Sequence, residues 1–143
     1  MEKKCRKIEY NVFPKQKTVV AKGLKDSYLN IYEETEMKSS KVARKVVEKI
    51  LIYNSEFPHD LDIIYGKDFT GVARCYEGDE FNERVGKEIA TCKADMKYHD
   101  AIARKYGLIM RMLEETYKEL RKLQKYHENK VDNIVEDIDR YYK

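Results

Sequence analysis

The stretch that decides the fold is residues 85–141, which in blocks of seven is VGKEIAT CKADMKY HDAIARK YGLIMRM LEETYKE LRKLQKY HENKVDN IVEDIDR Y. The first and fifth positions of the blocks alternate at spacings of four and three, and fourteen of these seventeen positions are apolar or aromatic. The exceptions are His99, Gln124 and His127. A seven-residue apolar repeat sustained over about eight heptads is typical of a coiled-coil helix. An unbroken helix here would approach ~95 Å in length.

Two features could interrupt this helix. Gly107 costs about 1 kcal/mol relative to alanine in a helix interior, and the polar run 127–130 weakens the repeat. The alternatives are one long helix that pairs between subunits and an αα-hairpin that folds back within one. Because the repeat keeps its phase across both points, we predict one long or kinked helix. The same face could instead lie in a groove of a host protein. The residues expected to mediate self-association are Tyr106, Met110, Leu113, Tyr117, Leu120, Val131, Ile134 and Ile138.

Shorter elements precede the long helix. Residues 7–13 alternate in polarity and residues 18–21 are rich in β-branched side chains, so a β-hairpin is predicted with its turn at 14–16. Residues 69–75 predict a further strand, in which Gly71 could allow close packing or a bulge. An apolar stripe predicts a helix near 40–54, begun by Ser39 or Ser40. Residues 28–32 could open a helix capped by Asp26 or Ser27, or extend the sheet, and residues 60–66 could be a strand or a buried loop.

Together these elements predict an α+β fold. We expect a small antiparallel sheet packed on a helix, followed by a long C-terminal heptad-patterned helix or αα-hairpin. The domains would be residues 1–78, with a basic N-terminal hairpin, and residues 79–143, a helical or coiled-coil region. The charged fraction of 38%, with 6 Gly and 2 Pro, favours long solvated helices. No apolar run of about 18 residues occurs and the charged N-terminus does not resemble a signal peptide, so we expect a cytoplasmic protein without a membrane partner.

The net charge of +3 is unevenly distributed. Residues 1–25 hold eight basic and two acidic side chains, and the remainder holds 21 basic and 24 acidic ones. A basic segment at one end of a slightly acidic chain could contact phosphate or an acidic protein surface, or be a solvated hairpin face. Aromatic residues interleaved with lysine also suit single-stranded nucleic acid, although Tyr10 could instead pack the hairpin onto a helix. The candidate contact residues are Arg6, Lys7, Tyr10, Phe13, Lys15, Lys17 and Lys22.

No catalytic motif is present in the chain. The six glycines form no nucleotide-binding loop, and no G-x-S-x-G sequence occurs. The three cysteines form no C-x-x-C pair and the three histidines are scattered, so we expect no metal and no cofactor. Acidic residues at 77–83 suit the positive end of a helix dipole. Cys75 and Cys92 are expected to be buried as small apolar residues. We therefore predict a protein that is not an enzyme.

Three short segments carry a resemblance. Gly71–Cys75, Gly78–Phe81 and Val85–Ala90 form a G-x-A-x-C, D-x-F, G-x-x-x-A arrangement, preceded by a short strand at Lys17–Ala21. These segments resemble those of small phage- and prophage-encoded proteins of low-GC Gram-positive bacteria, a group with no established activity. The resemblance covers residues 8–100. The resemblance implies an accessory or anti-defence protein, such as an inhibitor of a CRISPR effector or another immunity enzyme, in the cytoplasm of a host bacterium. Gly86 is expected to let the strand at 69–75 pack closely.

The sequence thus predicts a non-enzymatic binding protein of phage origin. It would inhibit a host protein in the manner of an anti-CRISPR protein and form a homodimer through its C-terminal helix. The alternative is a single-stranded nucleic-acid-binding accessory protein of phage replication or recombination, with the basic hairpin as its contact surface.

Overall fold

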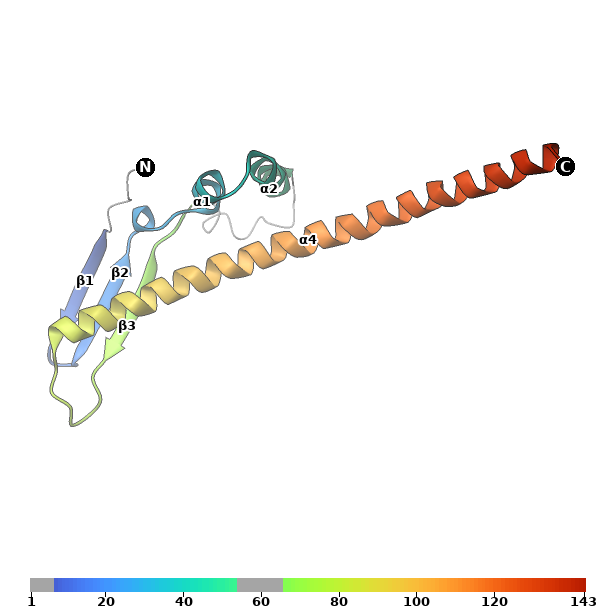
Figure 1. Ribbon diagram of the computed structural model, residues 1–143. Coiled ribbons are helices and arrows are strands. Elements are labelled where there is room, and N and C mark those ends of the chain that lie inside the picture. Colours follow the sequence, from blue (N-terminus) through green and yellow to red (C-terminus); the bar gives the residue numbers. More distant parts are fainter. Residues whose placement is uncertain (1–6, 54–65) are drawn as a thin grey trace. The chain divides into compact units, whose positions relative to one another are not determined.

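The computed structural model of the chain describes residues 7–53 and 66–143, which form two compact units on either side of the bond between Lys105 and Tyr106. The fold is α+β, as predicted, and its elements are coloured along the chain in Figure 1. In chain order they are β1 (Ile8–Phe13), β2 (Thr18–Gly23), a short 3-10 helix η1 (Lys25–Ser27), α1 (Ile31–Lys38), α2 (Lys41–Tyr53), β3 (Phe69–Arg74) and α4 (Glu83–Tyr141).

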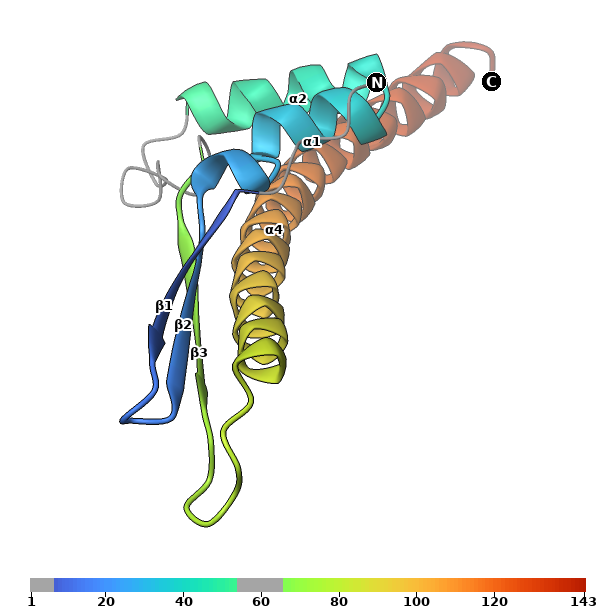
Figure 2. The same ribbon diagram turned by 90° about the vertical axis from the view of Figure 1, so that its left-hand side faces the viewer.

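The three strands form one antiparallel sheet in the order β1-β2-β3, which confirms the predicted hairpin and the predicted third strand. Tyr10 pairs with Ala21, and Ala21 pairs in turn with Gly71. Successive side chains point to opposite faces of a strand, so every second residue shares the face that holds Val19 and Ala21. Figure 2 shows the first turns of α4 lying along one side of this sheet.

The core between sheet and helix is built from small side chains. Val19, Ala21, Ala73 and Ala90 are buried together, and partly buried apolar residues of β1 pack against them. At Gly71 the helix backbone comes so close that an added Cβ would lie 2.6 Å from the nitrogen of Ala94 and closer still to the carbonyl oxygen of Ala90. Gly71 therefore allows close packing, as expected.

Gly86 has a similar function but a different neighbour. A Cβ at this position would lie 2.7 Å from Cγ2 of Val19, which belongs to β2. The expected neighbour was the strand at 69–75, so that assignment is corrected. Gly86 makes room for the central strand because Val19, a β-branched residue, projects directly toward α4.

An aromatic cluster closes one end of the core. The rings of Tyr28 and Tyr98 stack with centroids 4.5 Å apart, and Phe69 contacts both edge-on at 5.3 and 5.6 Å. The Tyr98 hydroxyl donates to the carbonyl oxygen of Leu29 at 2.7 Å. Burial, with the nearby Glu34 carboxylate as the next contribution, raises the pKa of Tyr98 to about 12. The cluster joins the loop before α1 to both β3 and α4.

Residues 28–32 divide between a loop and the beginning of α1. Neither Asp26 nor Ser27 caps this helix, because both lie in η1. The cap is Asn30, whose Oδ1 accepts from the Glu33 amide at 2.9 Å while its Nδ2 donates to the Glu33 carboxylate at 2.7 Å. This reciprocal pair resembles a capping box, except that Glu33 accepts from the Asn30 side-chain amide rather than from its backbone N–H. It begins a helix whose apolar pattern is weak.

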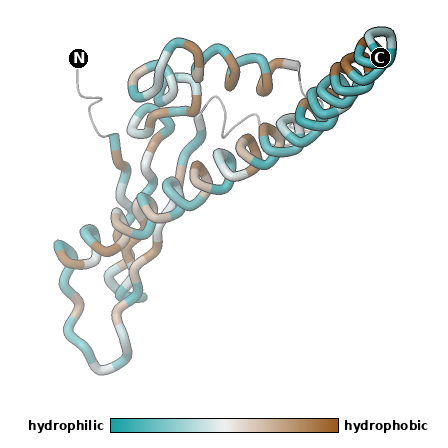
Figure 3. Tube along the Cα trace, turned by 45° about the vertical axis from the view of Figure 1, so that its right-hand side comes forward, coloured by the Kyte–Doolittle hydropathy of each residue, from teal (hydrophilic) through white to brown (hydrophobic). Residues whose placement is uncertain are grey.

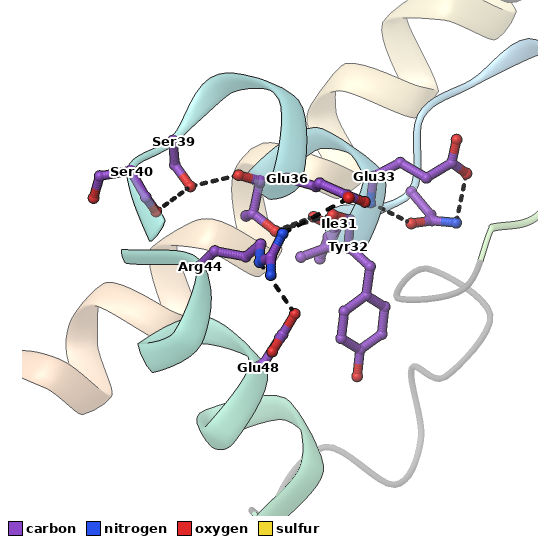
Figure 4. Close-up of polar contacts among 10 residues, drawn as sticks. Ile31, Tyr32, Glu33, Glu36, Ser39, Ser40, Arg44 and Glu48 are labelled. Atoms are coloured by element: carbon purple, nitrogen blue, oxygen red, sulfur yellow. Dashed lines mark hydrogen bonds and ion pairs between the residues drawn. The ribbon is translucent and has the colours of Figure 1, made fainter. Parts of the chain in front are cut away.

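The predicted helix near 40–54 is α2, and Ser40 caps it by accepting from the Ala43 amide at 3.1 Å. Arg44 lies between two carboxylates, that of Glu36 on α1 at 3.7 Å and that of Glu48 at 3.5 Å (Figure 4). The pair with Glu36 joins the start of α2 to α1, and the pair with Glu48 lies within α2. Of the uncertain stretch 60–66, residues 60–65 lie outside the described residues.

The long helix is continuous. α4 runs from Glu83 to Tyr141 through both predicted weak points, so the single-helix alternative is confirmed and the αα-hairpin is not formed. Asn82 caps it by accepting from the Val85 amide at 3.2 Å. Nothing lies within 4 Å of where a Cβ at Gly107 would be, and this glycine adopts no left-handed conformation. Along residues 7–53 and 66–143, no helix combines the length and apolar character that crossing a membrane requires.

Candidate interaction surfaces

The two aromatic residues of the basic hairpin lie on opposite faces of the sheet. Tyr10 faces α4, where its hydroxyl is 2.8 Å from Oγ1 of Thr91 and the Lys87 ammonium lies 5.4 Å from its ring centroid. Phe13 is an odd number of residues away, so it projects to the other face, where it is 44% exposed. Tyr10 and Phe13 therefore do not form one stacking surface. Tyr10 packs the hairpin onto the helix, the alternative raised from the sequence.

Most of the described hairpin lysines have a local partner. Lys7 pairs with Asp26 at 3.8 Å, Lys22 pairs with Asp68 at 3.4 Å, and Nζ of Lys17 donates to the carbonyl oxygen of Asp79 at 2.8 Å. Lys15 is exposed in the β1–β2 turn. Arg6 lies outside the described residues. The carboxylates of Asp26 and Asp68 offset part of the positive charge that the hairpin presents.

The sheet face that points away from α4 carries a mixed surface. Across the three strands, Phe13, Thr18 and Arg74 form one row, because Thr18 pairs with both of the others. The next row inward on this face runs through Val20 and Val72, which are half-buried. Arg74 was not among the residues predicted from the sequence, although its place at the end of an alternating strand put it opposite to the buried Ala73. Arg74 adds a cation to the same row as the exposed Phe13 ring, with the central strand between them.

A separate groove lies where β3 passes into α4. It has a volume of about 480 Å³ and is lined mainly by apolar side chains. Cys75 and Tyr76 form one wall, Phe81 contributes from the connection, and Val85 and Ile89 contribute from α4. Tyr76 is the most exposed of these. The groove was not expected from the sequence, because it forms only when residues 75–82 fold back along the helix.

In the first unit, α4 has two apolar faces with different surroundings. One face meets the sheet and is buried; it contains Ala90, Ala94, Tyr98 and Ile102. The heptad positions lie on the other face and are exposed; they are Val85, Ile89, Cys92 and Met96. The expectation that Cys92 is buried is therefore wrong for this chain, because the sheet covers the helix face opposite to it. Cys75 is only partly buried. The heptad pattern does not serve packing on the sheet.

In the second unit, the heptad face is exposed along almost all of its length. Every residue from Leu113 to Lys143 is exposed, including the apolar ones, and Figure 3 shows apolar residues recurring along this part of the helix. We call the heptad positions from 110 to 141 the C-terminal seam; its apolar members are Met110, Leu113, Tyr117, Leu120, Val131, Ile134, Ile138 and Tyr141. All eight are exposed, whereas Tyr106, just before the seam, is half-buried.

Among residues 7–53 and 66–143, no three His, Cys, Asp or Glu side chains lie close enough together to hold a metal ion. Comparison of the chain with protein-family models, with curated proteins and with solved structures gives no match. The structure itself therefore supplies the grounds for a function, and its three candidate surfaces are the C-terminal seam, the groove at the β3–α4 connection and the open sheet face.

Proposed function

We propose that this protein is a non-enzymatic binding protein that self-associates through the C-terminal seam. One observation carries the proposal: eight large apolar side chains recur at heptad spacing on a helix segment that no other described part of the chain covers. Fully burying one such side chain contributes about 1.5–3 kcal/mol. A seam of this kind is a surface for another helix, and a second copy provides an identical one.

The proposal explains how the exposed part of α4 is maintained. An isolated helix is marginal in water, and most helical stability in proteins comes from packing of an apolar face. The segment from Leu113 to Lys143 has no such packing in one copy. Pairing with a second copy supplies it. The heptad residues predicted for self-association from Met110 onward all belong to the C-terminal seam, so they have the exposure that the proposal requires.

Self-association is tested by light scattering after size-exclusion chromatography. We expect the wild-type protein to be a dimer and the variant Leu120→Glu to be a monomer, because Leu120 lies on the seam and is 60% exposed in one copy. Tyr126→Glu is the matched control, since Tyr126 is similarly exposed at 54% but lies off the seam. A wild-type protein that stays monomeric up to high micromolar concentration would refute the proposal.

We propose a host protein as the target of the two paired copies. The apolar groove at the β3–α4 connection is a feature that suits an apolar protein segment. The acidic residues Asp79 and Glu80 in its lining outnumber the one basic residue, Arg74, and so disfavour phosphate. Inhibition of an immunity enzyme by a phage protein is the form of this role that the resemblance implies.

Affinity capture from a bacterial lysate, with and without nuclease, tests the target class. Partners that persist after nuclease treatment and are lost in a Phe81→Glu variant support a protein target at the groove.

A second candidate function is supported by the row of Phe13, Thr18 and Arg74. An exposed aromatic ring and a cation on the same sheet face, separated by one strand, are suited to a nucleic-acid base and a nearby phosphate. Fluorescence anisotropy with a labelled single-stranded oligonucleotide tests it. Binding should weaken with salt and fall at least tenfold in Phe13→Ala and Arg74→Ala. Arg84→Ala is the control, because Arg84 is an exposed arginine on α4 that pairs with Glu88.

A further inference from the structure

The C-terminal seam has a symmetry of its own about the point between Lys125 and Tyr126. The polar seam residues Gln124 and His127 are equally distant from this point. Moving outward, the apolar residues also fall in equidistant pairs: Leu120 with Val131, Tyr117 with Ile134, Leu113 with Ile138, and Met110 with Tyr141. A two-fold axis through the midpoint, perpendicular to the helix, therefore maps each apolar seam residue onto another apolar seam residue.

Such an axis relates two helices that run in opposite directions. Residues equidistant from the axis then lie in the same layer, so Leu120 of one copy meets Val131 of the second copy, and every outer layer is wholly apolar. Gln124 meets His127 of the second copy in both polar layers. Arg121 donates to the Gln124 side-chain oxygen at 2.7 Å, so the Gln124 amide nitrogen remains a donor for an imidazole nitrogen. Gln124 and His127 thus contact each other across the interface, and neither contacts an apolar side chain in its layer.

The charged residues beside the seam agree with this arrangement. In an antiparallel pair, the residues that directly follow the seam positions 113, 120, 127 and 134 lie on one flank of the helix and face the same flank of the partner. Arg121 then lies near Glu128 of the second copy, and the symmetry gives two such opposite-charge pairs. On this flank Glu114 falls near Val135 of the second copy, and on the other flank Thr116 falls near Asp137. No two like charges face each other on either flank.

A parallel, in-register pair lacks these features. It places Gln124 against Gln124 and His127 against His127, and it brings Arg121 near Thr116 and Glu128 near Leu123 of the second copy. No opposite-charge pair then forms between the copies along residues 109–142. Apolar residues can pack against each other in the parallel and in the antiparallel orientation. The flanking charges and the polar layers therefore distinguish the two orientations.

We propose that two copies pair as an antiparallel coiled coil centred between Lys125 and Tyr126, with residues 110–141 of each copy in the contact. The inference rests on the self-association proposed above and adds its orientation and register. The paired segment spans about 47 Å along the helix and lies entirely within the second unit.

Disulfide trapping tests the register. In a background with Cys5, Cys75 and Cys92 replaced by serine, Leu120→Cys and Val131→Cys chains are mixed and equilibrated in a glutathione redox buffer, which supplies the oxidant for joining two thiols. We expect the mixture to form a disulfide between the two different chains, and Leu120→Cys alone to form little. A disulfide in Leu120→Cys alone at the level of the mixture would establish the parallel pair and overturn the inference. Light scattering confirms that each variant remains dimeric.

Charge reversal gives an independent readout. Arg121→Glu and Glu128→Arg each place two like-charge pairs in the proposed interface, so each should raise the dimer dissociation constant by about tenfold. The double variant restores opposite charges and should return it to within about threefold of the wild type. Additive weakening in the double variant contradicts the antiparallel register while the wild type remains dimeric. A monomeric wild type instead refutes the self-association itself, so the two failures are distinguishable.

Discussion

Gly71 lies where β3 packs against α4, and the helix can come this close because glycine has no side chain. The groups that a Cβ would meet are backbone atoms of Ala90 and Ala94, which cannot move without shifting the helix. We expect Gly71→Ala to lower the free energy of unfolding by about 3 kcal/mol, in the range of other overpacked cores. Urea unfolding followed by circular dichroism measures the change.

Gly107→Ala is the matched control for this substitution. Gly107 lies inside α4 with nothing within 4 Å of the added Cβ. The change should therefore raise the stability of the helix by about 1 kcal/mol, the difference between glycine and alanine in a helix interior. Equal effects of the two substitutions would contradict the close approach at Gly71.

Tyr98 predicts how stability depends on alkaline pH. Burial raises the pKa of its hydroxyl from 10.0 to about 12, so the folded state holds the proton more tightly than the unfolded state. The resulting stabilisation is complete below about pH 10 and is lost as the pH rises toward 12. Tyr98→Phe removes the hydrogen bond to Leu29, which should cost about 1 kcal/mol at neutral pH.

The comparison of these two proteins gives the measurement. Urea unfolding at a series of pH values should show the wild-type advantage over Tyr98→Phe shrinking between pH 10 and 12. A constant difference across that range would show that the Tyr98 hydroxyl titrates normally.

The helix α1 depends on its N-cap residue, Asn30. Of its eight residues only Ile31 and Thr35 are buried, so the cap contributes a large share of what holds the helix in place. Asn30→Ala removes both hydrogen bonds between Asn30 and Glu33 and should lower the free energy of unfolding by about 1 kcal/mol. Asn30→Asp keeps the accepting oxygen and should cost less than half as much. Thermal unfolding measured by circular dichroism checks both, and equal losses in the two variants would argue against the cap.

Local patterns predicted most of the elements but not their contacts. The hairpin, the third strand, α2 and the unbroken α4 each have a periodicity that appears within one segment. Residues 28–32 alone do not decide where α1 begins, because a run of large apolar residues with one asparagine fits a strand or a helix. The signal for the helix is the three-residue spacing of Asn30 and Glu33. The part of α4 that packs closest to the strands is formed by Gly86, Ala90 and Ala94, which a search for large apolar residues does not detect.

The candidate surfaces also divide into those that a local pattern predicts and those that depend on long-range contacts. The C-terminal seam could be predicted, since exposure of a heptad face depends mainly on the helix itself. The pairing of the lysines in the basic hairpin could not be predicted. The acceptors for Lys17 and Lys22 belong to Asp79 and Asp68, which are far along the chain and lie next to them only in the folded protein. The groove beside Phe81 also depends on a long-range fold and has no local pattern.

For the whole molecule, the proposed pairing predicts that helix content depends on protein concentration. Dilution separates the copies, and residues 113–143 then lose the packing that holds them helical. We expect the helical circular dichroism signal per residue to fall on dilution through the dissociation constant in the wild type. Leu120→Glu should show the low value at all concentrations. A wild-type signal that is constant over a thousandfold range of concentration, across which light scattering shows dissociation, would contradict this coupling.

The exposure of every residue from Leu113 to Lys143 has a further consequence, which concerns protein turnover. This segment holds many lysines and arginines, the residues after which trypsin cleaves, and proteases act on chain that has locally unfolded. A copy without a partner would expose such sites along about nine turns of helix, whereas a paired copy would protect them. Proteolysis would then remove unpaired copies first, so the protein's lifetime in a cell would increase with its own abundance.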